Sequence, residues 1–177
     1  MEAQHIEHTL EPVFDKRSRV LVLGTMPSPK SREVGFYYGH PQNRFWRVME
    51  ALFELPSHSL VENDMRRAFL LEHHIALWDV LASCTIEGAA DASIVDAIPN
   101  DLTRIFDAAP ITHVFTTGGK ATQLCQRMNG DMLSARNIAL TGLPSTSAAN
   151  ARMRLDQLVK AYRPIVHAVT AGNCHAK

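Results

Sequence analysis

The sequence has few cysteines and no spaced set of metal ligands. Its 3 cysteines, Cys84, Cys125 and Cys174, are far apart, and no two of them form a CxxC pair. Three thiols cannot hold an iron–sulfur cluster that needs four, and their spacing disfavours a zinc ribbon or a disulfide framework. Free thiols in a reducing compartment are the simplest interpretation, and we expect neither a metal nor another cofactor.

Long apolar runs and an excess of charge are also missing. No apolar stretch approaches the roughly 20 residues that a membrane span needs, and the N-terminus lacks the apolar core of a signal peptide. We therefore expect a cytoplasmic protein with no membrane partner. Lysine plus arginine and aspartate plus glutamate number 18 each. Without a bulk positive field, any contact with nucleic acid must come from a local patch.

What the sequence does contain is an alternation of apolar strands and helices. The length of 177 residues fits one domain, residues 1–177, and we expect its mixed N-terminal segment, residues 1–16, to be loosely held. The alternation predicts an α/β fold, a three-layer sandwich with a central, mainly parallel four-stranded sheet flanked by helices. The expected strands are 19–24, 75–80, 113–117 and 137–141, and the expected helices are 43–53, 62–74, 101–108, 118–128 and 151–162.

Two loops are candidates for a functional site. Residues 24–43, GTMPSPKSREVGFYYGHPQN, follow the first expected strand, and residues 141–152, TGLPSTSAANAR, follow the fourth. In parallel α/β sheets, ligands bind at the carboxyl ends of the strands, where both loops begin. Residues 85–100 are instead small and polar, which predicts an irregular stretch ending at Asn100 as a helix N-cap.

Other motifs have simpler interpretations. Gly118, Gly119 and Lys120 lack the GxxxxGK[ST] spacing of a phosphate loop, and Ser145 does not stand in a GxSxG nucleophile elbow. His113 has no partner at metal-ligand spacing. These residues carry no functional assignment of their own.

Several segments resemble the uracil-DNA glycosylase superfamily. Residues 24–46, GTMPSPKSREVGFYYGHPQNRFW, are similar to its first motif, particularly in the mismatch-specific uracil-DNA glycosylases, where a G-x-N-P turn precedes H-P-x-N-R-F-W at the same spacing. Residues 143–152, LPSTSAANAR, are similar to its second motif, the loop that enters DNA beside the flipped base. Residues 75–84, 98–102 and 112–121 resemble the hypoxanthine-DNA (deoxyinosine) glycosylase branch, so the likeness covers nearly the whole chain.

Two positions depart from the better-known branches. Met26 stands where the mismatch-specific branch has a water-positioning Asn, and Leu143 stands where another branch has a base-stabilising His. A thioether is only a weak acceptor, and leucine has no polar group. The hypoxanthine branch departs in the same way, and its resemblance implies that Asn43 is the catalytic residue and that Tyr38 stacks on the flipped base.

Further site residues are implied by the same resemblance. The expected base-binding residues are Gly24, Thr25, Met26, Tyr38 and His40. The expected DNA-binding residues are Lys30, Arg44, Ser145, Thr146, Ser147 and Arg152. An asparagine amide can accept a hydrogen bond from water and donate one to a leaving base. The alternative for Asn43 is the N-cap of the helix that follows it, a role that asparagine fills well.

The expected function is base-excision repair. The resemblance implies a monofunctional DNA glycosylase that hydrolyses the N-glycosidic bond of deaminated bases, chiefly hypoxanthine and more weakly uracil. Two alternatives stay open, a mismatch-specific uracil-DNA glycosylase and a catalytically inactive relative that binds DNA or bases. The expected partner is DNA that contains deaminated bases, and we expect the protein to be a monomer.

Overall fold

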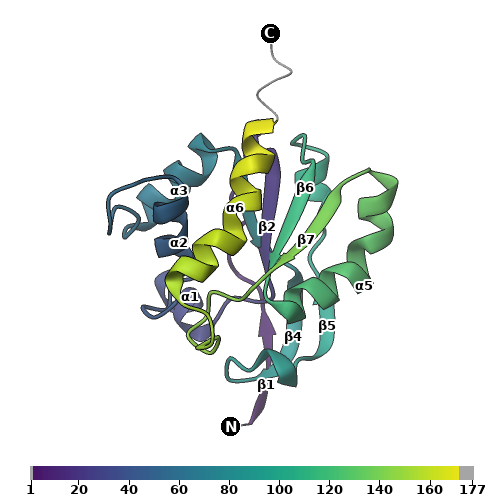
Figure 1. Cartoon of the computed structure of the whole chain (residues 1–177). Helices are drawn as coiled ribbons and strands as arrows, with labels where there is room; N and C mark the ends of the chain where they lie inside the picture. The colour runs from purple at the N-terminus through teal and green to yellow at the C-terminus, as the bar shows by residue number, and fades with distance from the viewer. Residues whose placement is uncertain (1, 172–177) are drawn as a thin grey trace.

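A four-stranded parallel sheet forms the centre of the structure, a computed structural model that describes residues 2–171 (Figure 1). Each strand of this sheet pairs in parallel with its neighbours, and β2 and β3 are buried along their whole length. Continuous burial explains why these strands are apolar runs without alternation. The predicted fold class is confirmed. In the order β3-β2-β6-β7 the strands are Ile75–Asp79, Val20–Gly24, His113–Thr117 and Ala139–Leu143.

Helices connect and flank these strands. α2 packs against α6, α3 packs on β3, and α5 packs on β6 and β7, while Figure 1 shows α6 in front of the sheet near β2. None of the described helices is long and apolar enough to cross a bilayer. The helices are α1 (Pro29–Val34), α2 (Phe45–Leu52), α3 (Asn63–Glu72), α4 (Thr103–Phe106), α5 (Gly119–Ala135) and α6 (Leu155–Ala171), with a 3₁₀ turn, η1 (Asp91–Ser93).

A second, antiparallel sheet is present that the sequence pattern does not predict. Its strands are β1 (Ala3–Glu7), β4 (Leu81–Glu87) and β5 (Val95–Pro99), in the order β1-β4-β5. The expectation for residues 85–100 is therefore wrong, because they contain the end of β4 and all of β5. The N-terminal segment also differs from its expectation, since β1 pairs along its full length with β4. Both edge strands are largely exposed, so neither shows a core-facing alternation in the sequence.

The helix α1 lies within the first candidate loop. Ser28 caps it, with its Oγ accepting from the backbone N–H of Ser31 at 3.1 Å, and Pro29 occupies the first turn. Gly35 ends the helix in the left-handed conformation, at φ 71°. A serine–proline start and a glycine end are ordinary helix signals, but six residues are too few for a visible apolar period.

Asn100 fixes the end of β3 and does not cap the helix that follows it. The Asn100 side-chain N–H groups donate to the carbonyls of Asp79 at 3.0 Å and of Leu81 at 2.9 Å. The predicted N-cap is therefore wrong, and Asp101 takes a similar role by accepting from the backbone N–H of Thr103 at 3.0 Å. As a result, Asn100 holds the backbone where the chain passes from one sheet to the other.

The described cysteines are buried and free. Cys84 and Cys125 form no disulfide, and Cys174 lies outside the described residues. Burial raises the pKa of the Cys125 thiol to about 11 and also raises the pKa of Cys84. Both thiols therefore stay protonated at neutral pH and belong to the core, as buried unreactive cysteines do.

Candidate active site

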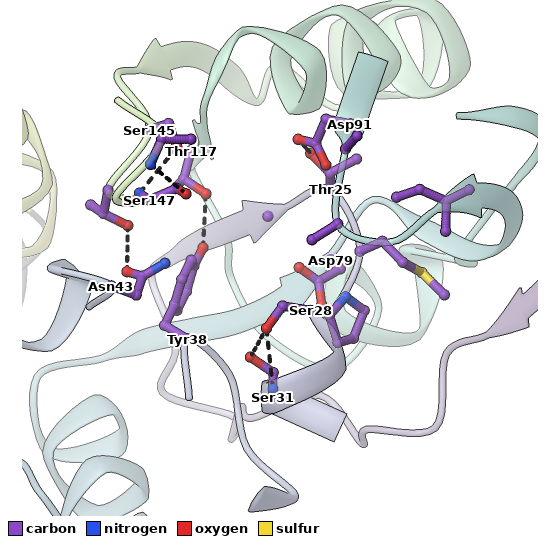
Figure 2. A pocket seen from close by; sticks show the side chains of 18 of the residues that line it. Thr25, Ser28, Ser31, Tyr38, Asn43, Asp79, Asp91, Thr117, Ser145 and Ser147 are labelled. Carbon is purple, nitrogen blue, oxygen red and sulfur yellow. Dashed lines mark hydrogen bonds between the residues drawn. The ribbon is translucent and has the colours of Figure 1, made fainter. Parts of the chain in front are cut away.

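A cavity of about 380 Å³ opens where β2, β3 and β6 end at their carboxyl edge (Figure 2). Both candidate loops line it, together with the segment between β4 and β5. The volume lies within the about 300–1,000 Å³ that is usual for small-molecule pockets. The first loop contributes residues from Gly24 to Asn43, and the second contributes residues from Ser145 to Ala149. The sheet edge thus brings together the two segments that the sequence singles out.

Asn43 is held by its carbonyl. Its Oδ1 accepts from the backbone N–H of Phe45 at 2.9 Å and from the hydroxyl of Thr146 at 2.8 Å. A backbone N–H can only donate, so the atom that faces it must be the amide oxygen. Among the described residues nothing accepts from the Asn43 NH₂ group, which Figure 2 shows turned toward the cavity. The side chain therefore supports the first turn of α2 and also offers a donor to the cavity.

This arrangement changes the chemistry that Asn43 can perform. Both acceptor positions of its carbonyl are occupied within the chain, so it does not offer that oxygen to a water molecule. Its free NH₂ group can donate to a developing negative charge. Because Phe45 and Thr146 fix the amide before any ligand arrives, the donor is preorganised.

Tyr38 presents one aromatic face to the cavity. Its other face is stacked on Phe45, with ring centroids 4.0 Å apart and planes 13° from parallel. Its hydroxyl lies 2.8 Å from Oγ1 of Thr117. Burial and, next, the nearby Asp79 carboxylate raise the pKa of Tyr38 well above its ordinary value, so the phenol stays neutral. The backbone is left-handed, at φ 52°, a strained conformation that is typical of functional positions.

The turn after β2 lets the chain approach the cavity closely. A Cβ atom at Gly24 would lie 2.4 Å from Oδ1 of Asp79, so only glycine fits beside this carboxylate. The hydroxyl of Thr25 donates to Oδ2 of Asp91 at 3.0 Å. Met26 is half-buried and lines the cavity, which places a thioether, and no strong polar group, at the position where related branches have asparagine.

Arg44 supports the second loop from within the chain. Its guanidinium donates to the carbonyls of Ser147 at 2.8 Å, Asn150 at 2.9 Å and Thr146 at 3.3 Å, and also to the carbonyl of Met153. These bonds use four of the five N–H groups of a guanidinium. The structure therefore does not present Arg44 as a free cation for a phosphate, contrary to the expectation from the sequence.

The serine and threonine residues of the second loop have unequal positions. Thr146 is buried, with 1% exposure, and its hydroxyl donates to Asn43. It supports the site from behind and cannot contact a phosphate as the sequence suggests. Ser145 and Ser147 are half-buried and line the cavity, and their hydroxyls accept from the backbone N–H groups of Ser147 and Ala149 at 3.2 Å.

Three predicted contact residues lie outside the cavity. His40 is exposed and its Nδ1 accepts from the backbone N–H of Gln42 at 3.1 Å. It does not line the cavity, so the structure does not bring it to the base-binding residues. Lys30 forms an ion pair with Glu33 at 2.8 Å, and Arg152 is exposed in the turn before α6. Of these two cations, Arg152 is the one that forms no ion pair within residues 2–171.

Three further residues, which are not among those expected from the sequence, also shape the site. Asp79 and Asp91 line the cavity, and the ring of His8 lies against Asp79 with Nε2 and Oδ2 2.8 Å apart. The carboxyl group that ends the otherwise apolar strand 75–79 is a signal that could have been used, because strand ends carry sites. His8 and Asp91 have no local signal, since their partners are 71 and 66 residues away in the chain.

The two carboxyl groups differ in their environments. The Asp79 side chain is 6% exposed and its partner His8 is 2% exposed, so this pair is enclosed. Asp91 lies at the accessible rim of the cavity. The surrounding protein raises the pKa of Asp91 by desolvation, and Asp79 raises it further, while the hydrogen bond from Thr25 opposes both effects. No group of three or more His, Cys, Asp or Glu residues within residues 2–171 is placed to hold a metal.

A cavity lined by aromatic and polar side chains at the carboxyl edge of a parallel α/β sheet is a usual place for a ligand-binding site. The chain belongs to the uracil DNA glycosylase superfamily, whose family model matches residues 11–166. Two curated relatives come from species of Methanosarcina. The protein named hypoxanthine DNA glycosylase in Methanosarcina acetivorans is 29% identical over 153 residues, which cover 83% of this chain and 90% of the relative.

A second relative and a solved structure agree with this assignment. The protein named hypoxanthine DNA glycosylase in Methanosarcina barkeri is 31% identical over 141 residues, covering 80% of this chain and 86% of the relative. The chain also superposes on a solution NMR structure from Methanosarcina acetivorans whose name is that of a uracil DNA glycosylase, with a TM-score of 0.74 and 26% identity. The match covers 93% of this chain and 100% of that protein.

Proposed function

We propose that the protein is a monofunctional DNA glycosylase that removes deaminated bases from DNA, chiefly hypoxanthine and more weakly uracil. Membership of the superfamily supports the reaction, and the names of two relatives support the base. The observation that carries the proposal is the convergence of both motifs on one cavity, where Asn43 and Tyr38 from the first meet Ser145 and Ser147 from the second.

The reaction is a hydrolysis. The target nucleotide must rotate out of the duplex, at a cost of a few kcal/mol that is smallest for mispaired or damaged bases. Water then forms a bond to C1′ of the deoxyribose, and the N-glycosidic bond breaks. The electron pair of that bond stays on the base, which takes up a proton. The products are an abasic site and the free base.

Asn43 stabilises the departing base in this scheme. As the bond breaks, negative charge spreads over the base, and the Asn43 NH₂ group donates to it. The amide is held by Phe45 and Thr146 through its oxygen, so no reorganisation is needed during the reaction. Because an amide is not a strong general base, the enzyme favours bases that leave readily as anions.

Tyr38 supplies the stacking surface. One face of the ring is covered by Phe45 at 4.0 Å, so a planar base can stack only on the face that lines the cavity. Stacking of this kind tolerates purines and pyrimidines alike because every base has a π-face. It therefore holds the base without deciding which base is accepted.

The DNA backbone is held by a local surface. Ser145, Ser147 and the backbone of the second loop lie at the cavity, and Arg152 is exposed beside them. Hydroxyl groups, backbone N–H groups and a few cations are usual phosphate contacts. This surface fits a chain whose net charge is zero, and we include in the proposal that the protein acts as a monomer in the cytoplasm.

Excision from defined oligonucleotides tests the proposal. Duplexes with a single deoxyinosine or a single deoxyuridine are incubated with excess protein, and abasic sites are then cleaved with alkali. We expect rapid strand cleavage at deoxyinosine and slow cleavage at deoxyuridine. Cleavage at deoxyuridine alone would favour a mismatch-specific uracil glycosylase, and no cleavage of either duplex would favour an inactive relative.

A further inference from the structure

One carboxylate oxygen in the cavity has no partner. Oδ2 of Asp79 accepts from Nε2 of His8 at 2.8 Å, but no donor among residues 2–171 reaches Oδ1. The Asp79 side chain is only 6% exposed, yet it lines the cavity. Figure 2 shows this carboxylate across the cavity from Asn43 and Tyr38. Oδ1 is open to the cavity, so a ligand N–H that enters the cavity can donate to it.

The surrounding structure fixes the direction of this carboxylate. The ring of His8 packs edge-on against Trp78, with centroids 6.2 Å apart at 84°, so its N–H is aimed at Oδ2. Gly24 leaves the space beside Oδ1 that a Cβ atom would fill, at 2.4 Å. Asn100 holds the backbone carbonyl of Asp79 at 3.0 Å. Separate elements therefore leave a single oxygen pointing toward an incoming ligand.

We propose that Asp79 selects the base by accepting a hydrogen bond from its ring N–H, and that His8 is the positioning residue that holds Asp79 for this contact. This inference rests on the proposed function and explains how the enzyme distinguishes one base from another. Hypoxanthine presents N1–H beside a carbonyl. Adenine, from which it forms by deamination, presents an unprotonated N1 whose lone pair would face the carboxylate. The contact therefore rejects the normal base that most resembles the damaged one.

His8 also affects how readily the base can leave. An ionised carboxylate beside a departing base opposes the negative charge that develops on it. The N–H of His8 draws charge toward Oδ2, at the end of the carboxylate that faces away from the ligand. The enclosed position of both side chains, 2% and 6% exposed, keeps water from weakening this interaction. His8 thus makes a carboxylate compatible with both recognition and release of the base.

A substrate series tests the contact without any mutation. Duplexes carry hypoxanthine, 1-methylhypoxanthine or adenine opposite cytosine, and excision is measured under single-turnover conditions. A site built to pair with an N–H can reject an analogue that lacks it by about 10⁴–10⁵. We expect the wild-type protein to excise hypoxanthine and to act at least about 100-fold more slowly on the other two bases.

Variants separate recognition from steric fit. In Asp79→Asn the size is kept and the N–H of His8 still donates to the oxygen, so the amide NH₂ faces the cavity. That group repels N1–H of hypoxanthine and suits N1 of adenine. We expect the hypoxanthine-to-adenine rate ratio to fall at least about 100-fold. Asp91→Asn is the matched control, because it removes a carboxylate at the same cavity that Thr25 already binds, and it should keep the ratio.

His8 is tested by two substitutions. His8→Phe fills the space without a donor, and His8→Gln can still donate to Asp79. We expect His8→Phe to lower the hypoxanthine-to-adenine ratio and His8→Gln to restore most of it, with both variants folded by circular dichroism. A purely structural role for His8 would change melting temperature and leave the ratio unaltered.

The outcomes distinguish this inference from the proposed function. If the wild-type protein excises hypoxanthine but Asp79→Asn keeps the wild-type ratio, the inference is overturned and the function stands. Equal wild-type rates on hypoxanthine and 1-methylhypoxanthine would also overturn it, and that arm does not depend on any variant folding. If the wild-type protein excises none of the bases, the proposed function itself fails and the inference fails with it.

Discussion

The two sides of the cavity differ in chemistry and in how the chain builds them (Figure 2). One side, here called the amide wall, consists of Tyr38 and Asn43, which come from one short segment of the chain. The other, the carboxylate wall, consists of Asp79 at the end of β3 and His8 just after β1, which lie far apart in the chain. The amide wall offers a donor and an aromatic face, whereas the carboxylate wall offers acceptors.

This difference suggests a division of roles. A preorganised donor stabilises negative charge as it develops, so the amide wall is suited to breaking the glycosidic bond. An acceptor responds to a hydrogen that the base carries before reaction, so the carboxylate wall is suited to choosing the base. Substitutions on the amide wall should therefore change the rate for every substrate. Substitutions on the carboxylate wall should change the ratio between substrates.

The largest expected effect is on the amide wall. Asn43→Ala should lower single-turnover excision of hypoxanthine by about 10²–10³, the scale for removal of one preorganised donor. It should also melt a few degrees lower, because the contact with the backbone N–H of Phe45 is lost. Asn43→Asp should stay folded but impaired, since an ionised carboxylate cannot donate to the base. An alanine variant that excises within a few-fold of wild type would leave Asn43 with a structural role alone.

The stacking residue should have the next largest effect. Aromatic–base stacking is worth roughly 1–3 kcal/mol per base, so Tyr38→Ala should slow excision by about 5- to 150-fold. Tyr38→Phe should be mild, because it keeps the ring and loses only the contact with Thr117. The loss should be similar for hypoxanthine and uracil. A Tyr38→Ala variant that is folded and as fast as wild type would show that Tyr38 is not the stacking surface for the base.

Arg44 and Arg152 provide a contrast between internal support and DNA contact. Arg44→Lys loses several bonds to loop carbonyls and should destabilise the fold by about 1–3 kcal/mol, the cost of unsatisfied buried groups. The salt dependence of DNA binding by this variant should stay unchanged. Arg152→Gln should leave stability alone and reduce the salt slope by about 1, as expected for one phosphate contact. The salt slope is measured by fluorescence-anisotropy titrations. A reduced slope for Arg44→Lys and an unchanged slope for Arg152→Gln would show that Arg44, and not Arg152, contacts the phosphate.

The smallest effect should lie outside both walls. His113 begins β6 and stacks on Phe115, with centroids 4.1 Å apart, and burial lowers its pKa below the ordinary value. A histidine whose folded-state pKa is depressed contributes stability above about pH 6.5, the unfolded value, and this stability is lost as the pH falls. His113→Gln should therefore flatten the loss of stability between pH 7.5 and pH 5 in urea unfolding. Excision by the folded fraction should not change. A variant with an unaltered pH profile of stability would show that His113 does not titrate on unfolding.

The parallel sheet could be predicted because its strands carry their signal locally. The expected strand 113–117 coincides with β6, and 19–24 and 75–80 match β2 and β3 to within one residue. The fourth strand begins two residues later than expected, at Ala139. β1, β4 and β5 could not be predicted in the same way, because their stability comes from pairing between distant segments and their edges are exposed.

The candidate site could be predicted only in part, for the same physical reason. Asn43 and Tyr38 lie in one continuous motif, and the structure places both at the cavity. Arg44 belongs to that motif too, but its contacts with residues about a hundred positions away assign it to the loop rather than to DNA. His8 lies in a segment expected to be loose, and only the pairing of β1 with β4 carries it to Asp79.

The division between the two walls is tested most directly by a crystal structure of the protein with DNA that contains 2′-fluoro-deoxyinosine. The electron-withdrawing fluorine disfavours positive charge on the sugar, so the substrate should bind without being cleaved. We expect hypoxanthine stacked on Tyr38, the Asn43 NH₂ group donating to the base, and N1 within about 2.7–3.2 Å of Oδ1 of Asp79. A base that stays in the duplex, or that binds with N1 turned away from Asp79, would contradict the account.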